Sequence, residues 1–161
     1  MRLSHLPLRL ATGAFLLNSG YSKRGLDAES AAGLQGMASS ALPQAAKMPP
    51  QQFGSMLSGG EMALGAALLA PFVSPVVAGA GLTAFSAGTL QMYRKLPGMT
   101  EPDGIRPTAA GTAIAKDVWM TAIGLALVVD GLIDGTRRTA RSTRRSVKRS
   151  AKKARKALPV G

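Results

Sequence analysis

The sequence predicts an all-α protein: a four-transmembrane-helix bundle with a short extracytoplasmic helix and a basic C-terminal tail that is helical or disordered. The first observation is composition, because 46% of the 161 residues are hydrophobic and only 17% are charged, whereas about a quarter of an ordinary soluble domain is charged. The second is that residues 48–93 contain one charged side chain, that of Glu61. The third is that 11 of the 20 lysines and arginines lie within residues 137–156, which contain no acidic residue.

This charge distribution divides the chain into two parts. Residues 1–136 carry 9 basic and 8 acidic side chains, so the formal net charge of +12 belongs almost wholly to the remainder. We therefore expect a four-helix membrane domain over residues 1–136 and a basic cytoplasmic tail over residues 137–161. The large apolar fraction of the first part argues against disorder there.

The first expected span covers residues 3–21. A helix of this length extends about 28 Å, close to the hydrocarbon thickness of about 30 Å. Pro7 falls in the first turn, where a missing N–H is tolerated. A cleaved secretory signal peptide is the competing interpretation, because Arg2 precedes an apolar stretch. No small-x-small cleavage site follows that stretch, which favours a retained span.

The second and third expected spans form a pair over residues 53–73 and 75–93. Pro71 and Pro75 lie at their junction, and prolines end one helix and begin the next. A buried helical hairpin of a soluble protein is the alternative interpretation. A stretch of this length with a single charge is more typical of a pair of membrane spans.

The fourth expected span, over residues 110–133, is the least apolar. Its uncharged centre covers residues 118–129, so a full crossing includes Lys116, Asp117 and Asp130. Charged groups are costly within a bilayer unless they are paired, face the bundle or lie close to its edge. We expect one of these environments for each of the three residues.

The connections and the charge balance predict the topology. Residues 22–50 should contain a short helix with Asp27 as its N-cap, and residues 96–107 are a turn-rich loop. Four spans place both termini on one side, which then carries 13 lysines and arginines against six or seven on the other. The positive-inside rule predicts a multi-pass protein of the cytoplasmic membrane with both termini inside.

The polar residues of these spans are candidates for intramembrane pairs: Arg9, Asn18, Glu61, Lys116 and Asp117. Counted along their helices from the same side, Glu61 and Lys116 both lie about 12–13 Å deep, so they can pair. Asp117 points about 100° away from Lys116 and needs another partner, and Arg9 enters from the opposite side. Such groups either staple helices together, form a proton or quinone site, or lie at the interface that Trp119 marks.

Small residues indicate where the expected spans contact one another. Ala80, Ala84 and Gly88 recur at four-residue spacing in the third span, and Gly60 and Gly65 lie in the second. Such positions let helices approach closely where the hydrophobic effect does not drive their association. We expect them to serve packing.

The tail is a basic amphipathic segment, since its 11 cations fall within about 180° of a helix at 100° per residue. We expect it to contact anionic lipid headgroups through Arg137, Arg138, Arg141, Arg144, Arg145, Lys148, Arg149, Lys152 and Lys153. Nucleic acid is the less favoured partner, because the tail has no aromatic residue for base stacking and no reading motif. A solvated tail that only fixes topology is the third alternative.

Residue types that are absent or rare exclude several reaction centres within the chain. Cysteine is absent, so disulfides, thiolate metal sites and iron–sulfur clusters are excluded. His5 is the single histidine, which excludes multi-histidine zinc sites and bis-histidine haem ligation. We expect no metal or haem, quinone stays open as a cofactor, and no self-contained catalytic constellation is evident.

The first span carries the pattern R-x3-G-x-F-x4-G-x2-K, formed by Arg9, Gly13, Phe15, Gly20 and Lys23. Residues 48–53, MPPQQF, lead into the second span, which then carries a Gly-Glu pair at residues 60–61 and a further glycine at residue 65. The fourth span carries a Lys-Asp pair at residues 116–117, followed by a glycine at residue 124.

In these features, over residues 3–133, the chain resembles DoxX-like membrane proteins, in particular their actinobacterial branch. The resemblance implies a four-helix bundle in a bacterial inner membrane. Relatives in this family include quinone-linked thiosulfate oxidoreductase subunits and membrane members of oxidative-stress complexes. A shared fold alone carries little information about activity.

Three function classes remain open. The first is an accessory or quinone-facing subunit of a membrane redox or oxidative-stress assembly, with redox proteins as partners. The second is a non-catalytic structural protein or a small-molecule transporter. The third is a membrane tether whose basic tail binds nucleic acid.

Overall fold

The computed structural model describes residues 4–157, except the side chains of Arg138, Arg149 and residues 151–157. Its elements, in order, are α1 (His5–Ser22), α2 (Ala28–Ala41), the 3₁₀ helix η1 (Pro43–Lys47), α3 (Pro50–Leu69), α4 (Pro75–Lys95), α5 (Thr112–Ala115) and α6 (Asp117–Ala157). Among the described residues the one extended pairing is a single bridge between Thr100 and Pro107. The all-α prediction is therefore confirmed.

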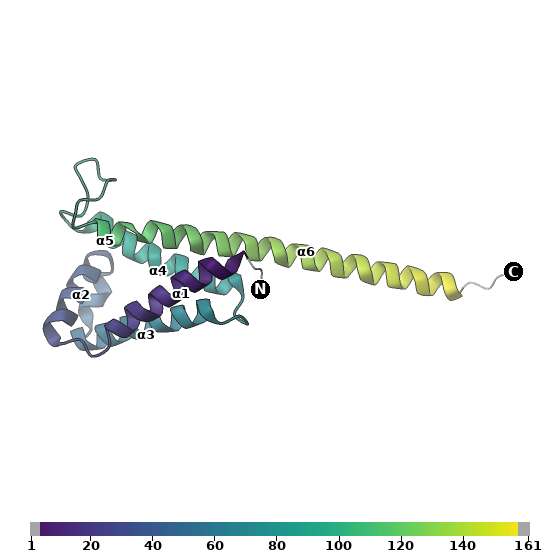
Figure 1. Ribbon diagram of the computed structural model, residues 1–161, viewed down its shortest axis with the longest axis horizontal. Helices are drawn as coiled ribbons and strands as arrows, with labels where there is room; N and C mark the ends of the chain where they lie inside the picture. Colours follow the sequence, from purple (N-terminus) through teal and green to yellow (C-terminus); the bar gives the residue numbers. More distant parts are fainter. Residues whose placement is uncertain (1–3, 158–161) are drawn as a thin grey trace.

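The helices form two antiparallel pairs, α1 with α3 and α4 with α6. The pairs lie close together near the N-terminus and diverge toward the other end, where α2 lies between them (Figure 1). From the point where the pairs meet, α6 continues outward as a single long helix. This arrangement leaves a space between the pairs beneath α2.

The α1–α3 contact depends on glycines. A Cβ atom at Gly13 would lie 3.0 Å from the carbonyl oxygen of Gly65, and one at Gly65 would lie 2.8 Å from that of Gly13. A Cβ at Gly20 would lie 2.7 Å from the Ser58 carbonyl oxygen, and the Ser58 hydroxyl donates to the Gly20 carbonyl at 2.7 Å. The two backbones approach too closely for any larger residue, as in glycine-mediated membrane helix contacts.

The α4–α6 contact follows the same principle. A Cβ at Gly79 would lie 2.6 Å from the carbonyl oxygen of Gly124, which makes this the tightest crossing of the pair. The buried Leu127 packs beside it. One turn on, the Thr121 hydroxyl hydrogen-bonds to the Ser86 hydroxyl at 2.9 Å. Packing glycines were therefore correctly expected, but at partly different positions.

Four expected contact positions do not lie at a helix crossing. Ala80 and Ala84 are exposed on α4, and nothing lies within 4 Å of a Cβ built at Gly88 or at Gly60. The four-residue spacing gave the wrong face of the third span, because the close crossing uses Gly79, one position before Ala80. Gly65 alone of the named glycines packs as predicted.

The helix α2 forms where the sequence predicts it. The Asp27 carboxylate caps it by accepting from the Ser30 backbone N–H at 2.7 Å, and these hydrogen bonds hold the pKa of Asp27 below its usual value. The Gln35 amide donates to the carbonyls of Ala45 and Met48 at 2.8 and 2.6 Å. This bond set ties α2 to the chain that leads into α3.

The junction of α3 and α4 is held by a buried arginine from α1. Arg9 is fully buried, and its guanidinium donates to four backbone carbonyls at 2.6–3.0 Å: those of Leu68, Ala67, Ala70 and Val73. The last carbonyls of a helix lack partners within it, and a cation there also complements the negative end of the helix dipole. Arg9 therefore caps the C-terminal end of α3. Arg9 was expected to form an intramembrane pair with a charged side chain, and its guanidinium contacts backbone carbonyls instead.

The expected boundaries need two corrections. The second span ends at Leu69 instead of residue 73, because Ala70 precedes Pro71 and is held extended. The fourth helix begins at Asp117, after the separate short helix α5 and a break at Lys116. It then runs to Ala157 without interruption, so no structural break marks the expected domain boundary after residue 136.

Within the described residues, one helical stretch is long and apolar enough to cross a membrane. It lies in Thr112–Lys148, where the most apolar window has a mean hydropathy of 1.6. Helices α1, α3 and α4 are 18, 20 and 21 residues long but fall short of this criterion. In α1 the cause is visible, since His5, Arg9 and Asn18 lower its mean hydropathy.

Candidate functional site

The space beneath α2 is a cavity of about 430 Å³ between the two helix pairs. Phe15 of α1, Met37 of α2 and Phe85 of α4 contribute to a lining that is mostly apolar. Four charged side chains also line it: Lys23, Glu61, Lys116 and Asp117. An apolar pocket with a few convergent polar groups is the usual form of a small-molecule site.

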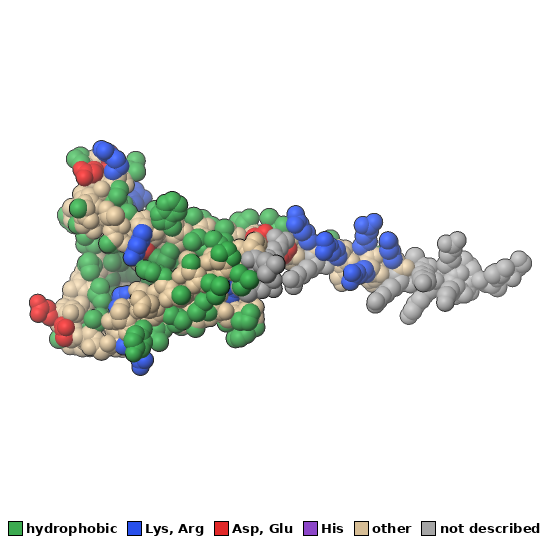
Figure 2. Space-filling model, in the orientation of Figure 1, with side chains coloured by type: hydrophobic (Ala, Val, Ile, Leu, Met, Phe, Trp, Pro, Cys, Tyr) green, Lys and Arg blue, Asp and Glu red, His purple; other side chains and the backbone are tan. Residues whose placement is uncertain are grey.

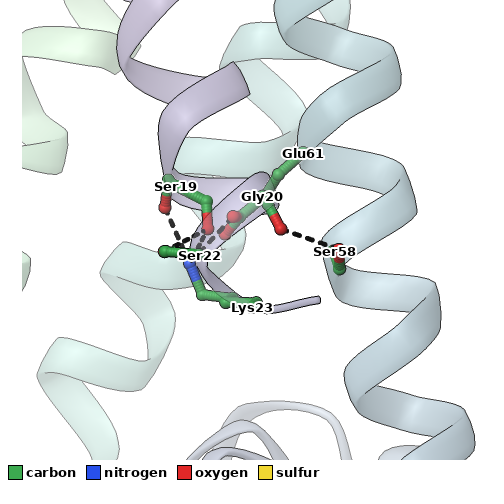
Figure 3. A network of polar contacts seen from close by, with 6 residues as sticks. All are labelled: Ser19, Gly20, Ser22, Lys23, Ser58 and Glu61. Carbon is green, nitrogen blue, oxygen red and sulfur yellow. Dashed lines mark hydrogen bonds and ion pairs between the residues drawn. The ribbon is translucent and has the colours of Figure 1, made fainter. Parts of the chain in front are cut away.

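A buried ion pair lies on one wall of this cavity. Lys23 follows the last residue of α1, and its Nζ lies 2.8 Å from Oε2 of Glu61 in α3. The side chain of Glu61 is only 6% exposed and that of Lys23 is 21% exposed. Lys23 also donates to the hydroxyl and carbonyl oxygens of Ser19, at 2.7 and 3.2 Å (Figure 3). Three acceptors therefore hold one ammonium group in place.

The opposite wall carries two charged side chains that are adjacent in the sequence, those of Lys116 and Asp117. Lys116 lies at the break between α5 and α6, and its Nζ is 4.7 Å from the centre of the Phe15 ring, a cation–π contact across to α1. Asp117 is buried at the start of α6 and contacts the Thr89 hydroxyl. Both Lys116 and Glu61 lie close enough to act electrostatically on Asp117.

The expected pairing of Glu61 is therefore corrected. Its ion-pair partner is Lys23 and not Lys116 or Arg9, although Lys116 lines the same cavity. The predicted topology places Lys23 in the external connection over residues 22–50, because the residue lies beyond the end of the first span. The long lysine side chain reaches back along the helix, and the G-x2-K end of the first motif was the signal that pointed to it.

Asn18 stands apart from the other candidates. It lies exposed on α1 and does not line the cavity. The side chains that the structure brings together are thus Glu61, Lys116 and Asp117 of the expected set, with Lys23 added.

A second polar contact joins the helix pairs at their other end. His5 of α1 lies with its Nε2 atom 2.5 Å from Oδ2 of Asp130 in α6. The ring is buried, and its Nδ1 atom has no hydrogen-bond partner within the described part of the chain. A contact between residues 125 apart has no local sequence signal, and it was not predicted.

The basic residues of the tail extend along the free part of α6. Arg137, Arg141, Arg144, Arg145 and Lys148 are exposed, and Figure 2 shows these cations along the helix as it leaves the bundle. The remaining candidates for lipid contact have side chains outside the described residues: Arg138, Arg149, Lys152 and Lys153.

Comparison of the chain with protein families, curated proteins and solved structures finds no match. The side chains that line the cavity indicate which ligands it can bind. The Lys116 ammonium group offers hydrogen-bond donors, the carboxylates of Glu61 and Asp117 offer acceptors, and aromatic and methionine side chains offer contact to a flat apolar molecule.

Proposed function

We propose that the chain is a four-span membrane protein of the DoxX-like type and that it serves as an accessory, quinone-facing subunit of a redox assembly in a bacterial cytoplasmic membrane. The observation that carries the proposal is the apolar cavity with Lys23, Glu61, Lys116 and Asp117 in its walls. Both termini lie inside, and the arginines nearest the bundle contact anionic headgroups.

The distribution of polar and apolar side chains supports a membrane setting for the whole bundle. Charged Arg9, Glu61 and Asp117 are buried, whereas large apolar side chains are exposed along the helices: Leu10, Phe15, Met56, Val77, Val118, Trp119, Leu125, Val129 and Leu132. Figure 2 shows apolar groups spread over the visible outer surface of the bundle. In water such a surface would be unfavourable, while in lipid the polar groups belong inside.

Helix length and hydroxyl bonding point the same way. Helices of 18, 20 and 21 residues extend about 27–32 Å, which matches a hydrocarbon core of about 30 Å. The hydroxyls of Thr12, Thr83 and Ser86 donate to carbonyls one turn earlier in their own helices. Polar groups satisfied in this way can face a bilayer interior.

The DoxX-like assignment gains support from what the motif residues do. Arg9 caps α3, Gly13 and Gly20 allow the α1–α3 approach, and Lys23 pairs with Glu61. These motif residues of α1 and α3 thus act together to pack α1 against α3 at one wall of the cavity.

The cavity has the chemistry that a quinone ring requires. A quinone has two carbonyl oxygens that accept hydrogen bonds. The ammonium group of Lys116, which lies over the Phe15 ring, is the donor available to them, because the three N–H groups of Lys23 already bond to Ser19 and Glu61. The flat ring of a quinone suits contact with Phe15 and with the apolar lining. When bound, a quinone would supply electron transfer, with the carboxylates of Glu61 and Asp117 in the walls around it.

The test is the quinone content of protein purified in mild detergent, with a cavity-filling variant as the comparison. A Cβ at Gly88 meets nothing within 4 Å and this residue lines the cavity, so Gly88→Leu should occupy the cavity without disturbing the helices. Gly59→Leu is the matched control, because Gly59 is equally open but lies outside the lining. We expect mass spectrometry to find quinone and redox proteins with the wild type and the control, and at least about fivefold less quinone with Gly88→Leu.

Quinone per phospholipid is the quantity to compare, because membranes carry free quinone into any detergent extract. Equal ratios in all three proteins, or none in the wild type, would contradict the quinone-facing role.

A further inference from the structure

The outer part of α6 projects beyond any membrane that the bundle occupies. The helix has 41 residues, which extend about 62 Å, twice the hydrocarbon thickness of about 30 Å. The exposed apolar face of α6 ends at Ile133, so residues 134–157 continue about 36 Å past the hydrocarbon edge. Figure 1 shows this part in line with the span.

Distance separates the tail cations into two groups. Headgroups add about 5–7 Å beyond the hydrocarbon, and the attraction of a charged surface fades over a Debye length of about 8 Å. A cation beyond about residue 144 of a straight helix is therefore outside the field of the headgroups. Arg145 lies at this limit, and six cations of the tail lie clearly beyond it: Lys148, Arg149, Lys152, Lys153, Arg155 and Lys156.

A soluble polyanion is the partner that suits these six cations best. Residues 137–161 contain no acidic residue that could neutralise them and no aromatic residue. The exposed Val147 is the largest apolar side chain within residues 137–157. A protein partner would normally find aromatic or large apolar anchors at the centre of its interface, and this helix offers none.

Duplex nucleic acid fits the spacing of the charges. Six cations within residues 148–156 occupy about 12 Å of helix axis, and a duplex presents about seven phosphate charges over the same length. Its major groove, about 12 Å wide, admits an α-helix. Single strands are less suitable, because they are held by stacking on aromatic side chains.

We propose that residues 148–156 of α6 form a sequence-independent binding site for duplex nucleic acid, carried about 20–35 Å beyond the hydrocarbon edge by the span. This proposal rests on α6 crossing the membrane, as in the function proposed above, and is independent of the redox role.

The test uses the full chain in nanodiscs of zwitterionic lipid and a 20-base-pair mixed-sequence DNA duplex, followed by fluorescence anisotropy. Engagement of six phosphates predicts a slope of log affinity against log salt near −5. A distal variant, Lys148→Gln, Arg149→Gln, Lys152→Gln and Lys153→Gln, should flatten the slope by about 4 and weaken binding at least about 30-fold. Glutamine keeps the helix propensity close to that of lysine and arginine.

The matched control removes four charges nearer the membrane: Arg137→Gln, Arg138→Gln, Arg141→Gln and Arg144→Gln. We expect this proximal variant to lose less than about fivefold in duplex affinity, because its charges lie beside the headgroups. Equal losses in the two variants, or no duplex binding by the wild type, would overturn the proposal.

An anionic lipid surface is the competing partner, and a probe at Ser150 distinguishes it. The chain has no cysteine, so Ser150→Cys can be labelled uniquely with a fluorophore. In nanodiscs with anionic lipid, the probe should remain unquenched by a headgroup-level quencher. Strong quenching with loss of duplex binding would assign the tail to the membrane instead. A protein that fails to co-elute with nanodiscs would count against the membrane proposal itself.

Discussion

Replacing Arg9 with methionine is expected to lower the free energy of unfolding of the detergent-solubilised bundle by about 3–5 kcal/mol. The guanidinium of Arg9 is fully buried and serves four carbonyls at the junction of α3 and α4. Methionine fills a similar volume but donates no hydrogen bond, so the carbonyls of Leu68, Ala67 and Val73 would lose the guanidinium as donor. The Ala70 carbonyl would keep its bond from the Val73 N–H. An SDS titration followed by circular dichroism measures the change.

Two further variants make the Arg9 result specific. Arg9→Lys should recover only part of the loss, because an ammonium group cannot reproduce the planar fork of donors. Arg24→Met is the matched control near the other end of α1; Arg24 is exposed and lies over the Tyr21 ring, and its loss should cost less than about 0.5 kcal/mol. Equal effects of Arg9→Met and Arg24→Met would show that the cap contributes little.

Lys23→Met should destabilise the bundle by about 2–4 kcal/mol, because it leaves the Glu61 carboxylate buried without its ion-pair partner. The double variant Lys23→Met with Glu61→Gln removes both charges and should recover more than half of that loss. The same SDS titration gives all three values, and their combination gives the coupling energy of the pair.

Lys116→Met is the control for this cycle, because Lys116 lines the same cavity while its ammonium group lies over the Phe15 ring. We expect a coupling energy between Lys116 and Glu61 below about 0.5 kcal/mol. A larger coupling energy for Lys116 than for Lys23 would show that Lys116, the partner expected from depth counting, is the true partner of Glu61.

Features with local causes were predictable from the sequence. Prolines at the α3–α4 junction and the Asp27 cap act on their neighbours in the chain, so the elements formed where their residues indicated them. The presence of Glu61 and Lys116 in one site also followed, since both lie at similar depth on their helices. Asp117, which was expected to point away from Lys116 and to need another partner, lines the same cavity.

Features set by the way helices diverge were not predictable. Because the two helix pairs separate toward α2, Lys116 lies across a cavity from Glu61, and Lys23 fills the nearer position. The contact of His5 with Asp130 depends on where the pairs meet, which no periodicity encodes. The break between α5 and α6 at Lys116 was also not predictable, because neither a proline nor a glycine occupies that position.

The central claim is that four helices cross the membrane, and cysteine labelling from outside the cell tests it most directly. Single cysteines at Ser30, Phe72 and Ser142 are exposed positions in α2, the α3–α4 junction and the tail. With both termini inside, an impermeant maleimide should label Ser30→Cys and leave Phe72→Cys and Ser142→Cys unlabelled until the membrane is opened. If α6 were the sole crossing, Phe72→Cys and Ser30→Cys would lie on the same side. Equal labelling of those two positions in intact cells would therefore contradict the four-span account.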